Sequence, residues 1–328
     1  MPQPKISAVG TFVPSHVLTN TDLEKMVDTS DEWILTRTGI SERHIAAPDE
    51  ATSDLAARAA SAALAEAGVP ASGIDTIIVC TVTPDMFFPA TACLVQHKIG
   101  AAKAWGFDLS AACAGFIFGI TTAANLVMAG TQKRVLVIGA DTMSRIIDYT
   151  DRATCVLFGD GAGAFLIEPS TEEGFGFIGS HNEIDGSGGD TLKMPAGGSR
   201  IPSSVETVQQ RLHYVHQDGQ AVFKFAVRKT QEACLTALEK FNLRPEDIKL
   251  LVPHQANQRI ILAAAERLGL SRDRVVINIA KYGNTTAATI PLATRQALDE
   301  GRIQKGDIVL FAAVGAGFTV GASLWRWA

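Results

Sequence analysis

The stretch AGTQKRVLVIGAD, residues 129–141, passes from a helix end marked by glycine into a strand of Val, Leu and Ile, and EGRIQKGDIVLFAAV, residues 300–314, repeats that order. A second pair of segments shows the same order of a helix followed by a strand. The helical pattern of residues 52–69 leads to the apolar strand DTIIVCTV (75–82), as residues 230–243 lead to IKLLVPH (248–254). The offset is about 172 residues in both pairs, which predicts a chain built from two similar halves.

The predicted fold class is α/β, because strands alternate with helices along both halves. Each strand is a continuous run of β-branched and aliphatic residues, which is typical of strands that helices cover on both faces. We therefore expect two buried mixed sheets with helices layered against them. The first half is predicted to span residues 1–172 and the second residues 221–328. We interpret the segment 170–220, rich in Gly, Ser and Pro, as an excursion from the first half.

Composition excludes several classes of protein. With 328 residues and 47% hydrophobic side chains the chain can bury a large core, and its net charge of −5 provides no general basic field for nucleic acid or acidic membranes. The opening MPQPKISAVG lacks the apolar region of a signal peptide, so we expect a cytoplasmic protein. Five well-separated cysteines without a C-x-x-C pair favour neither disulfides nor structural zinc, and no metal site is predicted.

The uncharged run from Leu109 to Gln132 is long enough to span a bilayer. Polar residues interrupt it, and Asp108 directly precedes it. A single span this polar would be poorly stabilised in lipid. We therefore expect a helix buried inside the protein, and no association with a membrane.

Cys113 occupies a position that suits a nucleophile. It lies in GFDLSAACAGF, where a short strand, Ala104 to Leu109, passes through small residues into an apolar helix. Unpaired N–H groups and the dipole at a helix start favour a thiolate, although the dipole alone would leave the thiol mostly protonated near neutral pH. The backbone N–H of Cys113 could also stabilise the oxyanion of a tetrahedral intermediate.

His254 and Asn284 are predicted to join Cys113 in one site. His254 ends the strand IKLLVP, and Asn284 lies in the turn KYGNTTAAT. Shifting Cys113 by the repeat offset leads to residues 284–286, so corresponding turns of the two halves carry Cys and Asn. Ligands in α/β folds gather at the carboxyl ends of strands, where such turns meet. A histidine or a turn asparagine alone would as readily have a structural role.

Seven motifs together resemble the β-ketoacyl-acyl-carrier-protein synthase III family of condensing enzymes, which have the thiolase fold. They are EWILTRTGI (32–40), DLSAACAGF (108–116), GADTMS (139–144), FGDGAGA (158–164), VPHQAN (252–257), KYGNTTAAT (281–289) and GAGFTVGA (315–322). The similarity runs from Gly10 to Trp327. It implies a thiolase-like duplicated fold, layered αβαβα, and an acyltransferase that starts fatty acid synthesis from an acyl-CoA, with acetyl-CoA as the expected starter, and malonyl-acyl carrier protein.

The resemblance also implies roles for individual residues. Cys113 would carry the acyl group, His254 and Asn284 would bind the malonyl thioester carbonyl and stabilise the enolate left by decarboxylation, and Ala316 would supply a second oxyanion N–H. Coenzyme A and its pantetheine arm would contact Thr29, Trp33, Arg37, Arg152, Gly219 and Asn257, with the adenine held between Trp33 and Arg152. The acyl pocket would involve Phe88, Met143, Leu157 and Phe158.

The same resemblance implies partners but no cofactor, since coenzyme A thioesters are substrates. Lys224 and Arg259 would help to dock the acidic carrier protein. Phe88 would enter the acyl pocket of a neighbouring subunit, which implies a homodimer. Arg228 and Arg267 could extend the basic patch or simply face solvent.

Two other glycine-rich stretches do not support nucleotide binding. GFGFIG, residues 174–179, fits G-x-G-x-x-G but is not followed by an apolar helix, and FGDGAGAFLIE, residues 158–168, lacks the Lys-Ser/Thr ending of a phosphate loop. Two alternatives remain. One is a related condensing or acyl-transfer enzyme that uses a longer or branched acyl-CoA in secondary metabolism. The other is a carrier-binding protein with an inactive site.

Overall fold

The first sheet of the computed structural model, which describes residues 3–328, has five strands in the order β1-β7-β6-β4-β5. β4 is parallel to both β5 and β6, whereas β7 is antiparallel to β6 and to β1. The sheet is therefore mixed, as predicted. Its strands are β1 (Pro4–Phe12), β4 (Thr76–Cys80), β5 (Trp105–Leu109), β6 (Val135–Asp141) and β7 (Gly161–Pro169).

The second sheet has four strands in the order β11-β12-β13-β8. β11 and β12 are parallel, and β12-β13 and β13-β8 are antiparallel pairs. This order repeats β4-β6-β7-β1 of the first sheet. The strands are β8 (Gly176–Ile184), β11 (Leu250–Pro253), β12 (Ile308–Gly315) and β13 (Thr319–Arg326).

The position of β8 corrects the predicted role of segment 170–220. Its strand pairs with β13 from Gly176 to Ile184 and so belongs to the second sheet, where it corresponds to β1. The excursion is therefore the shorter stretch between β8 and the next long helix, and it lies within the second half. Without β8, β13 would be an edge strand with unpaired backbone groups. β8 pairs with it at the position that the repeat order indicates, although the glycine-rich sequence did not predict a strand there.

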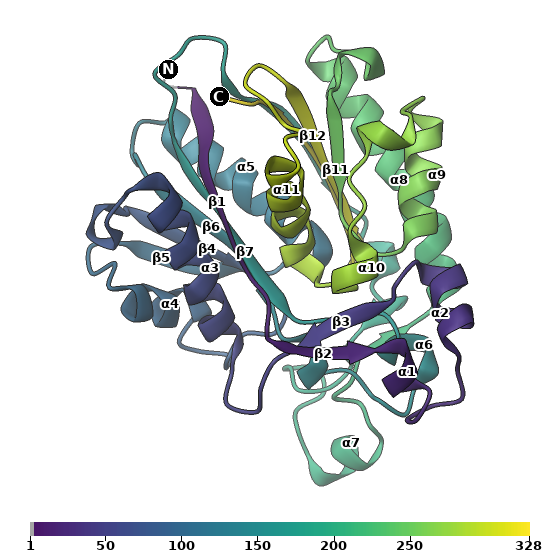
Figure 1. Ribbon diagram of the computed structural model, residues 1–328. Coiled ribbons are helices and arrows are strands. Elements are labelled where there is room, and N and C mark those ends of the chain that lie inside the picture. Colours follow the sequence, from purple (N-terminus) through teal and green to yellow (C-terminus); the bar gives the residue numbers. More distant parts are fainter. Residues whose placement is uncertain (1–2) are drawn as a thin grey trace.

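Two sheets and three pairs of helices build five layers (Figure 1). α5 (Gly115–Met128) and α11 (Thr289–Asp299) lie between the two sheets, and their apolar residues form one core with both inner faces, including Phe116, Ile290 and Phe311. α3 (Thr52–Ala67) and α4 (Thr91–Ile99) cover the outer face of the first sheet, and α8 (Gly219–Lys240) and α9 (Gln258–Arg267) cover that of the second. The layering is αβαβα, which confirms the predicted fold.

The run considered as a membrane span forms α5, which is buried in the central layer. Eight of its residues are buried, among them Phe116, Ile117 and Ile120. Within residues 3–328, the structure contains no helix with the length and apolar character that crossing a bilayer would require.

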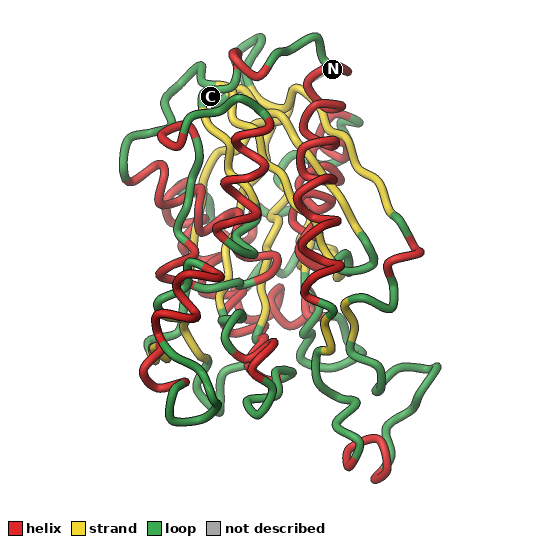
Figure 2. The backbone as a smooth tube through the Cα atoms, turned by 90° about the vertical axis from the view of Figure 1, so that its right-hand side faces the viewer, coloured by secondary structure: helices red, strands yellow, loops and turns green. Residues whose placement is uncertain are grey.

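The remaining elements gather at the end of the molecule where β5 and β11 finish. Figure 2 shows the excursion with its short helix α7 projecting beyond the layers. These elements are β2 (His16–Thr19), α1 (Asn20–Leu23), α2 (Asp31–Thr38), β3 (Glu42–Ile45), α6 (Arg152–Cys155), β9 (Leu192–Lys193), α7 (Val205–Gln209), β10 (His216–Gln217) and α10 (Ile279–Tyr282).

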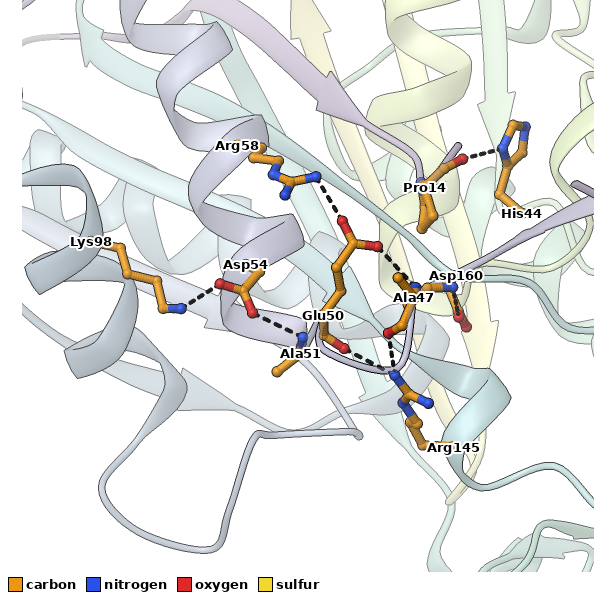
Figure 3. A network of polar contacts seen from close by, with 11 residues as sticks. Pro14, His44, Ala47, Glu50, Ala51, Asp54, Arg58, Lys98, Arg145 and Asp160 are labelled. Carbon is orange, nitrogen blue, oxygen red and sulfur yellow. Dashed lines mark hydrogen bonds and ion pairs between the residues drawn. The ribbon is translucent and has the colours of Figure 1, made fainter. Parts of the chain in front are cut away.

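A polar network fixes the connection from β3 to α3 (Figure 3). The carboxylate of Glu50 accepts hydrogen bonds from the side chain of Arg58 and the backbone N–H of Ala47. Arg145 donates to the backbone oxygens of Ala47 and Glu50. These contacts join the loop to the residues that follow β6, close to the strand ends where the candidate site lies.

Candidate active site

Cys113 lies in a tight turn between β5 and α5. The turn is a short 3₁₀ helix, η2 (Ala112–Ala114), and Ala112 has a φ of 47°. A non-glycine residue in this left-handed region costs on the order of 1 kcal/mol and is held there by its surroundings. Thr319 contributes by donating from Oγ1 to the backbone oxygen of Ala111 at 2.7 Å. Cys113 as a whole residue is 7% exposed and lies at the start of a buried helix.

The second half contains the same turn. η7 (Thr286–Ala288) precedes α11, and Thr286 has a φ of 50°. Aligning Ala112 with Thr286 pairs Cys113 with Ala287, so Asn284 lies three residues before the position equivalent to the cysteine. The repeat offset therefore leads to the equivalent turn. Which residue of that turn is equivalent to Cys113 follows from the positive φ that Ala112 and Thr286 share.

Asn284 is held in a fixed orientation. Its backbone N–H donates to the oxygen of Leu157 at 2.9 Å, and its own oxygen accepts from Gly159 at 3.1 Å. The side-chain Oδ1 accepts from the N–H of Thr286 at 2.9 Å. Since Oδ1 is engaged, Nδ2 is the end of the amide available to donate to a substrate.

His254 follows β11 and is 7% exposed. Its backbone N–H donates to Ala312 on β12 at 2.8 Å, and its Nδ1 lies 2.7 Å from Oγ1 of Thr289 on α11. Its Nε2 is buried and has no hydrogen-bond partner among residues 3–328. An unpaired buried nitrogen is rare in proteins, and it leaves Nε2 available to pair with a bound molecule.

The structure brings the three predicted catalytic residues together. Cys113, His254 and Asn284 all line one cavity of about 90 Å³. Leu157, Phe158, Gly219 and Asn257 line it as well, with apolar side chains from α8 such as Phe223. The cavity therefore brings one sulfur together with the polar side chains of Gln217, His254, Asn257 and Asn284 in otherwise apolar surroundings, which is typical of an enclosed site for a small reacting group.

Burial controls the charge of this site. Desolvation raises the pKa of the Cys113 thiol to about 12, with a smaller contribution from the negative charge of Asp141. Desolvation also lowers the pKa of His254 to about 3. The expectation that the helix start favours a thiolate is thus outweighed at rest: the thiol and the imidazole are both neutral around neutral pH.

The end of β12 approaches the backbone of the cysteine. A side-chain carbon at Gly315 would lie 2.7 Å from the nitrogen of Cys113 and 2.9 Å from that of Ala114. Only glycine allows this approach without displacing the turn. Ala316, the predicted second oxyanion donor, lines a neighbouring cavity together with Cys113.

That neighbouring cavity has a volume of about 150 Å³ and is mainly apolar. It contains Met143 and Phe158, two of the predicted acyl-pocket residues, whereas Leu157 lines the first cavity. Phe88 is 85% exposed, and neither cavity of the described chain includes it. Within one subunit Phe88 is thus a surface residue.

Of the predicted coenzyme A contacts, Gly219 and Asn257 line the cavity, whereas Trp33, Arg37 and Arg152 form a cluster on α2 and α6. The guanidinium groups of Arg37 and Arg152 lie 5.1 and 4.9 Å from the ring centre of Trp33, and Arg152 also donates to the oxygen of Asp28. Thr29 Oγ1 is buried without a hydrogen-bond partner among residues 3–328. Because Arg152 already stacks on Trp33, a purine between them would require the guanidinium to move.

Asn257 has a structural task that the sequence did not reveal. Its Oδ1 accepts from the N–H of Arg259 at the start of α9, and its Nδ2 donates to the oxygen of Arg37 at 3.0 Å. It thereby joins α9 to α2 while lining the cavity. The predicted docking residues Lys224 and Arg259 are both exposed, and the Arg259 guanidinium lies 5.3 Å from the ring centre of Phe223.

Three residues of the site were not predicted from the sequence. Thr289 contacts His254, Thr286 orients Asn284, and the buried Asp141 accepts hydrogen bonds from Thr286, Thr81 and Thr83. Asp141 ends the repeated strand quoted first, and both threonines lie in the motif KYGNTTAAT. Their position in these motifs was the available signal, but hydroxyl and carboxylate side chains at strand and helix ends are too common to be singled out.

A larger hollow lies elsewhere on the second sheet. It has a volume of about 830 Å³ and is lined by charged residues, including Arg274, Arg302 and Arg326. These arginines donate to backbone oxygens of neighbouring loops. The hollow is at the amino ends of β11 and β12, away from the strand ends where ligands of α/β folds bind. Residues 3–328 contain no cluster of three or more His, Cys, Asp or Glu side chains that could hold a metal ion.

Comparison with known proteins agrees with the fold and the motifs. The family models described as 3-oxoacyl-[acyl-carrier-protein (ACP)] synthase III and its C-terminal part match residues 107–186 and 238–327. The β-ketoacyl-[acyl-carrier-protein] synthase III proteins of Solibacter usitatus and Koribacter versatilis are 67% and 57% identical to this chain, over 100% and 99% of it and 100% and 98% of their own lengths.

A solved structure gives the same result. The crystal structure of the synthase III from Thermus thermophilus is 48% identical, with a TM-score of 0.92, over 99% of both chains. The similarity to these proteins therefore extends over nearly the whole chain. The chain therefore belongs to the β-ketoacyl-[acyl-carrier-protein] synthase III family of thiolase-fold acyltransferases.

Proposed function

We propose that this protein starts fatty acid synthesis by joining an acyl group from acyl-CoA, with acetyl-CoA as the main starter, to malonyl-acyl carrier protein. The observation that carries the proposal is the single cavity shared by Cys113, His254 and Asn284. In the first step, the Cys113 sulfur attacks the thioester carbon. The Cys113–acyl bond forms, the bond to coenzyme A breaks, and the thiol proton ends on the released coenzyme A.

In the second step, the carbonyl oxygen of the malonyl thioester accepts hydrogen bonds from His254 and from Nδ2 of Asn284. The bond to the carboxylate breaks and carbon dioxide leaves, so its electron pair forms an enolate that these two neutral donors stabilise. The enolate carbon attacks the acyl group on Cys113. Backbone N–H groups of Cys113 and Ala316 are the proposed oxyanion donors. The bond between the acyl carbon and the Cys113 sulfur then breaks, which releases the 3-ketoacyl-acyl carrier protein, and the thiolate takes up a proton from water to restore the thiol.

Coenzyme A is proposed to bind along the elements around the cavity mouth. The buried, unpaired Oγ1 of Thr29 and the indole of Trp33 offer a polar and an aromatic contact. Arg37 and Arg152 carry the positive charge that phosphate groups require. Gly219 and Asn257, which line the cavity, would contact the pantetheine arm. No cofactor is needed for this chemistry, because the groups that leave, coenzyme A and carbon dioxide, come from the thioester substrates themselves.

Two kinds of protein partner follow from the same proposal. The exposed cations Lys224 and Arg259, on the helices that flank the cavity, would attract an acidic carrier protein. A second copy of the chain would cover the free edge of β5 and the exposed side chains of Phe87 and Phe88. We also propose that the chain arose from two thiolase-like halves that meet near residues 172–176, and that it acts in the cytoplasm.

The alternative of a longer or branched starter in secondary metabolism is less favoured, because the proteins that are 67% and 57% identical over their full lengths are named as synthases III. An inactive carrier-binding protein is also disfavoured, since the unpaired Nε2 of His254 faces a site that still contains the thiol.

The test separates the two steps. Radiolabelled acetyl-CoA should label the wild-type protein but not Cys113→Ala, and His254→Ala and Asn284→Ala should accept the label while losing decarboxylation of malonyl-acyl carrier protein by about 100-fold or more. Absence of label on the wild type, or full condensation by His254→Ala, would contradict the proposal.

A further inference from the structure

Thr289 is the only side chain of the described residues that forms a hydrogen bond with His254. It lies at the start of α11, is 2% exposed, and its Oγ1 is 2.7 Å from Nδ1 of the imidazole. The same oxygen lies 3.0 Å from the backbone oxygen of Thr286. The hydroxyl therefore has two neighbours that can accept its one hydrogen, and which of them receives it decides the state of the histidine.

A neutral imidazole carries a single N–H hydrogen, and its other nitrogen accepts. If Thr289 donates to Thr286, Nδ1 must hold the imidazole hydrogen, and Nε2 then faces the cavity as an acceptor. If Thr289 donates to Nδ1, the hydrogen is on Nε2, and the cavity receives a donor. Nε2 of His254 has no hydrogen-bond partner among residues 3–328, so no contact at Nε2 fixes which nitrogen holds the hydrogen.

The backbone leaves the Thr289 hydroxyl free to turn away from Thr286. The oxygen of Thr286 already accepts the backbone N–H of Thr289, which caps η7. It is therefore satisfied without the hydroxyl. The proposed function then requires the second arrangement. A thioester carbonyl can only accept, so Nε2 must hold the single hydrogen of the neutral imidazole, and Nδ1, whose one side-chain neighbour among the described residues is Thr289, must accept from the hydroxyl.

We propose that Thr289 is a positioning residue, whose hydroxyl donates to Nδ1 of His254 and so keeps the hydrogen of the imidazole on Nε2, where it points at the substrate carbonyl. The proposal rests on the proposed function, in which His254 donates to the malonyl thioester. It also defines what His254 does not do: with a hydrogen on Nε2 it cannot accept the proton of Cys113. The first step should thus be indifferent to Thr289 and the second sensitive to it.

The experiment compares three variants of the full-length protein. Thr289→Val keeps the shape of the side chain but removes the hydroxyl, and Thr289→Ser restores it. Thr294→Val is the matched control, because Thr294 is on the same helix, is fully buried, and bonds only to the backbone oxygen of Ile290 at 2.8 Å. Decarboxylation of malonyl-acyl carrier protein and labelling by acetyl-CoA are measured separately for each.

We expect Thr289→Val to lose about tenfold or more in decarboxylation and to keep its labelling rate within about twofold. Thr289→Ser and Thr294→Val should remain close to the wild type in both steps. Equal decarboxylation by Thr289→Val and the wild type would overturn the proposal, as would an equal loss in Thr294→Val, which would indicate general damage to α11.

A spectroscopic measurement gives a test that needs no active variant. In protein labelled with ¹⁵N-histidine, the signal lost in His254→Ala identifies this residue among seven histidines. Its nitrogen shifts should show hydrogen on Nε2 in the wild type and a mixture in Thr289→Val. Hydrogen on Nδ1 in the wild type would refute the inference about Thr289. A wild type that does not decarboxylate would instead refute the proposed function, whatever the spectrum shows.

Discussion

At Cys113, two opposing effects act on one thiol. The start of a helix stabilises a thiolate by about 1 kcal/mol. Desolvation raises the pKa from 9.0 to about 12, and each pKa unit corresponds to about 1.4 kcal/mol. Burial is therefore the larger effect, and the Cys113 thiol is protonated at rest. The four other cysteines include the buried Cys80, Cys155 and Cys234, whose pKa values burial also raises, and the exposed Cys93.

This predicts the pH dependence of Cys113 alkylation. The reactive thiolate is the minor form below the pKa, so its fraction rises about tenfold for each pH unit. The rate of iodoacetamide labelling at Cys113, followed by mass spectrometry of its peptide, should therefore increase from pH 6 to about pH 10 without a plateau. The peptide of exposed Cys93 gives an internal comparison. A plateau for Cys113 near pH 7 would mean that a thiolate is stabilised at rest.

At the scale of elements, the site depends on where strands end against 3₁₀ turns. The sequence was sufficient to predict the strands before Cys113 and His254 within two residues, because continuous apolar runs bounded by polar turns have few other structures. It was insufficient for β8, whose glycines and polar residues hide a strand at the edge of the second sheet. It also could not predict that Gly315, at the end of β12, touches the backbone of η2, since such an approach depends on packing between the halves.

Gly315→Ala should therefore damage the site through its backbone. The added carbon would lie 2.7 Å from the nitrogen of Cys113, so the turn or β12 must shift. We expect stability to fall by about 1–3 kcal/mol, measured by urea unfolding, and the rate of Cys113 acetylation to fall about tenfold or more as the oxyanion N–H moves. Gly198→Ala is the control, because an added carbon there meets no atom within 4 Å. Normal acetylation by Gly315→Ala would show that this approach has no catalytic importance.

At the scale of the whole molecule, the duplication explains why a site could be predicted from residues so far apart. Equivalent turns with positive φ at Ala112 and Thr286 meet between the sheets, so one repeat offset was enough to connect Cys113 with Asn284. The hydroxyl and carboxylate contacts of Asp141, Thr286 and Thr289 depend on side-chain orientation across the two halves. No pattern within one half contains that information, and only the assembled fold reveals it.

One part of the acyl pocket should come from a second copy of the chain. β5 is the edge strand of the first sheet, its Trp105 is 50% exposed, and Phe87 and Phe88 are 80% and 85% exposed. Unpaired strand edges and large exposed aromatic side chains are costly in water, and dimerisation removes both. Sedimentation should therefore detect a dimer of the 34.8 kDa chain.

If Phe88 closes the partner's pocket, Phe88→Ala should enlarge the cavity of about 150 Å³ that contains Met143 and Phe158. Removing a buried aromatic ring leaves space for several methylene groups, so the ratio of rates for hexanoyl-CoA over acetyl-CoA should rise about tenfold or more. Val205→Ala, on the projecting helix α7 and 76% exposed, should leave the ratio unchanged. An unchanged ratio in a dimeric Phe88→Ala protein would mean that the pocket ends within one subunit. A monomeric wild type would contradict the idea that Phe88 of a second copy closes the pocket.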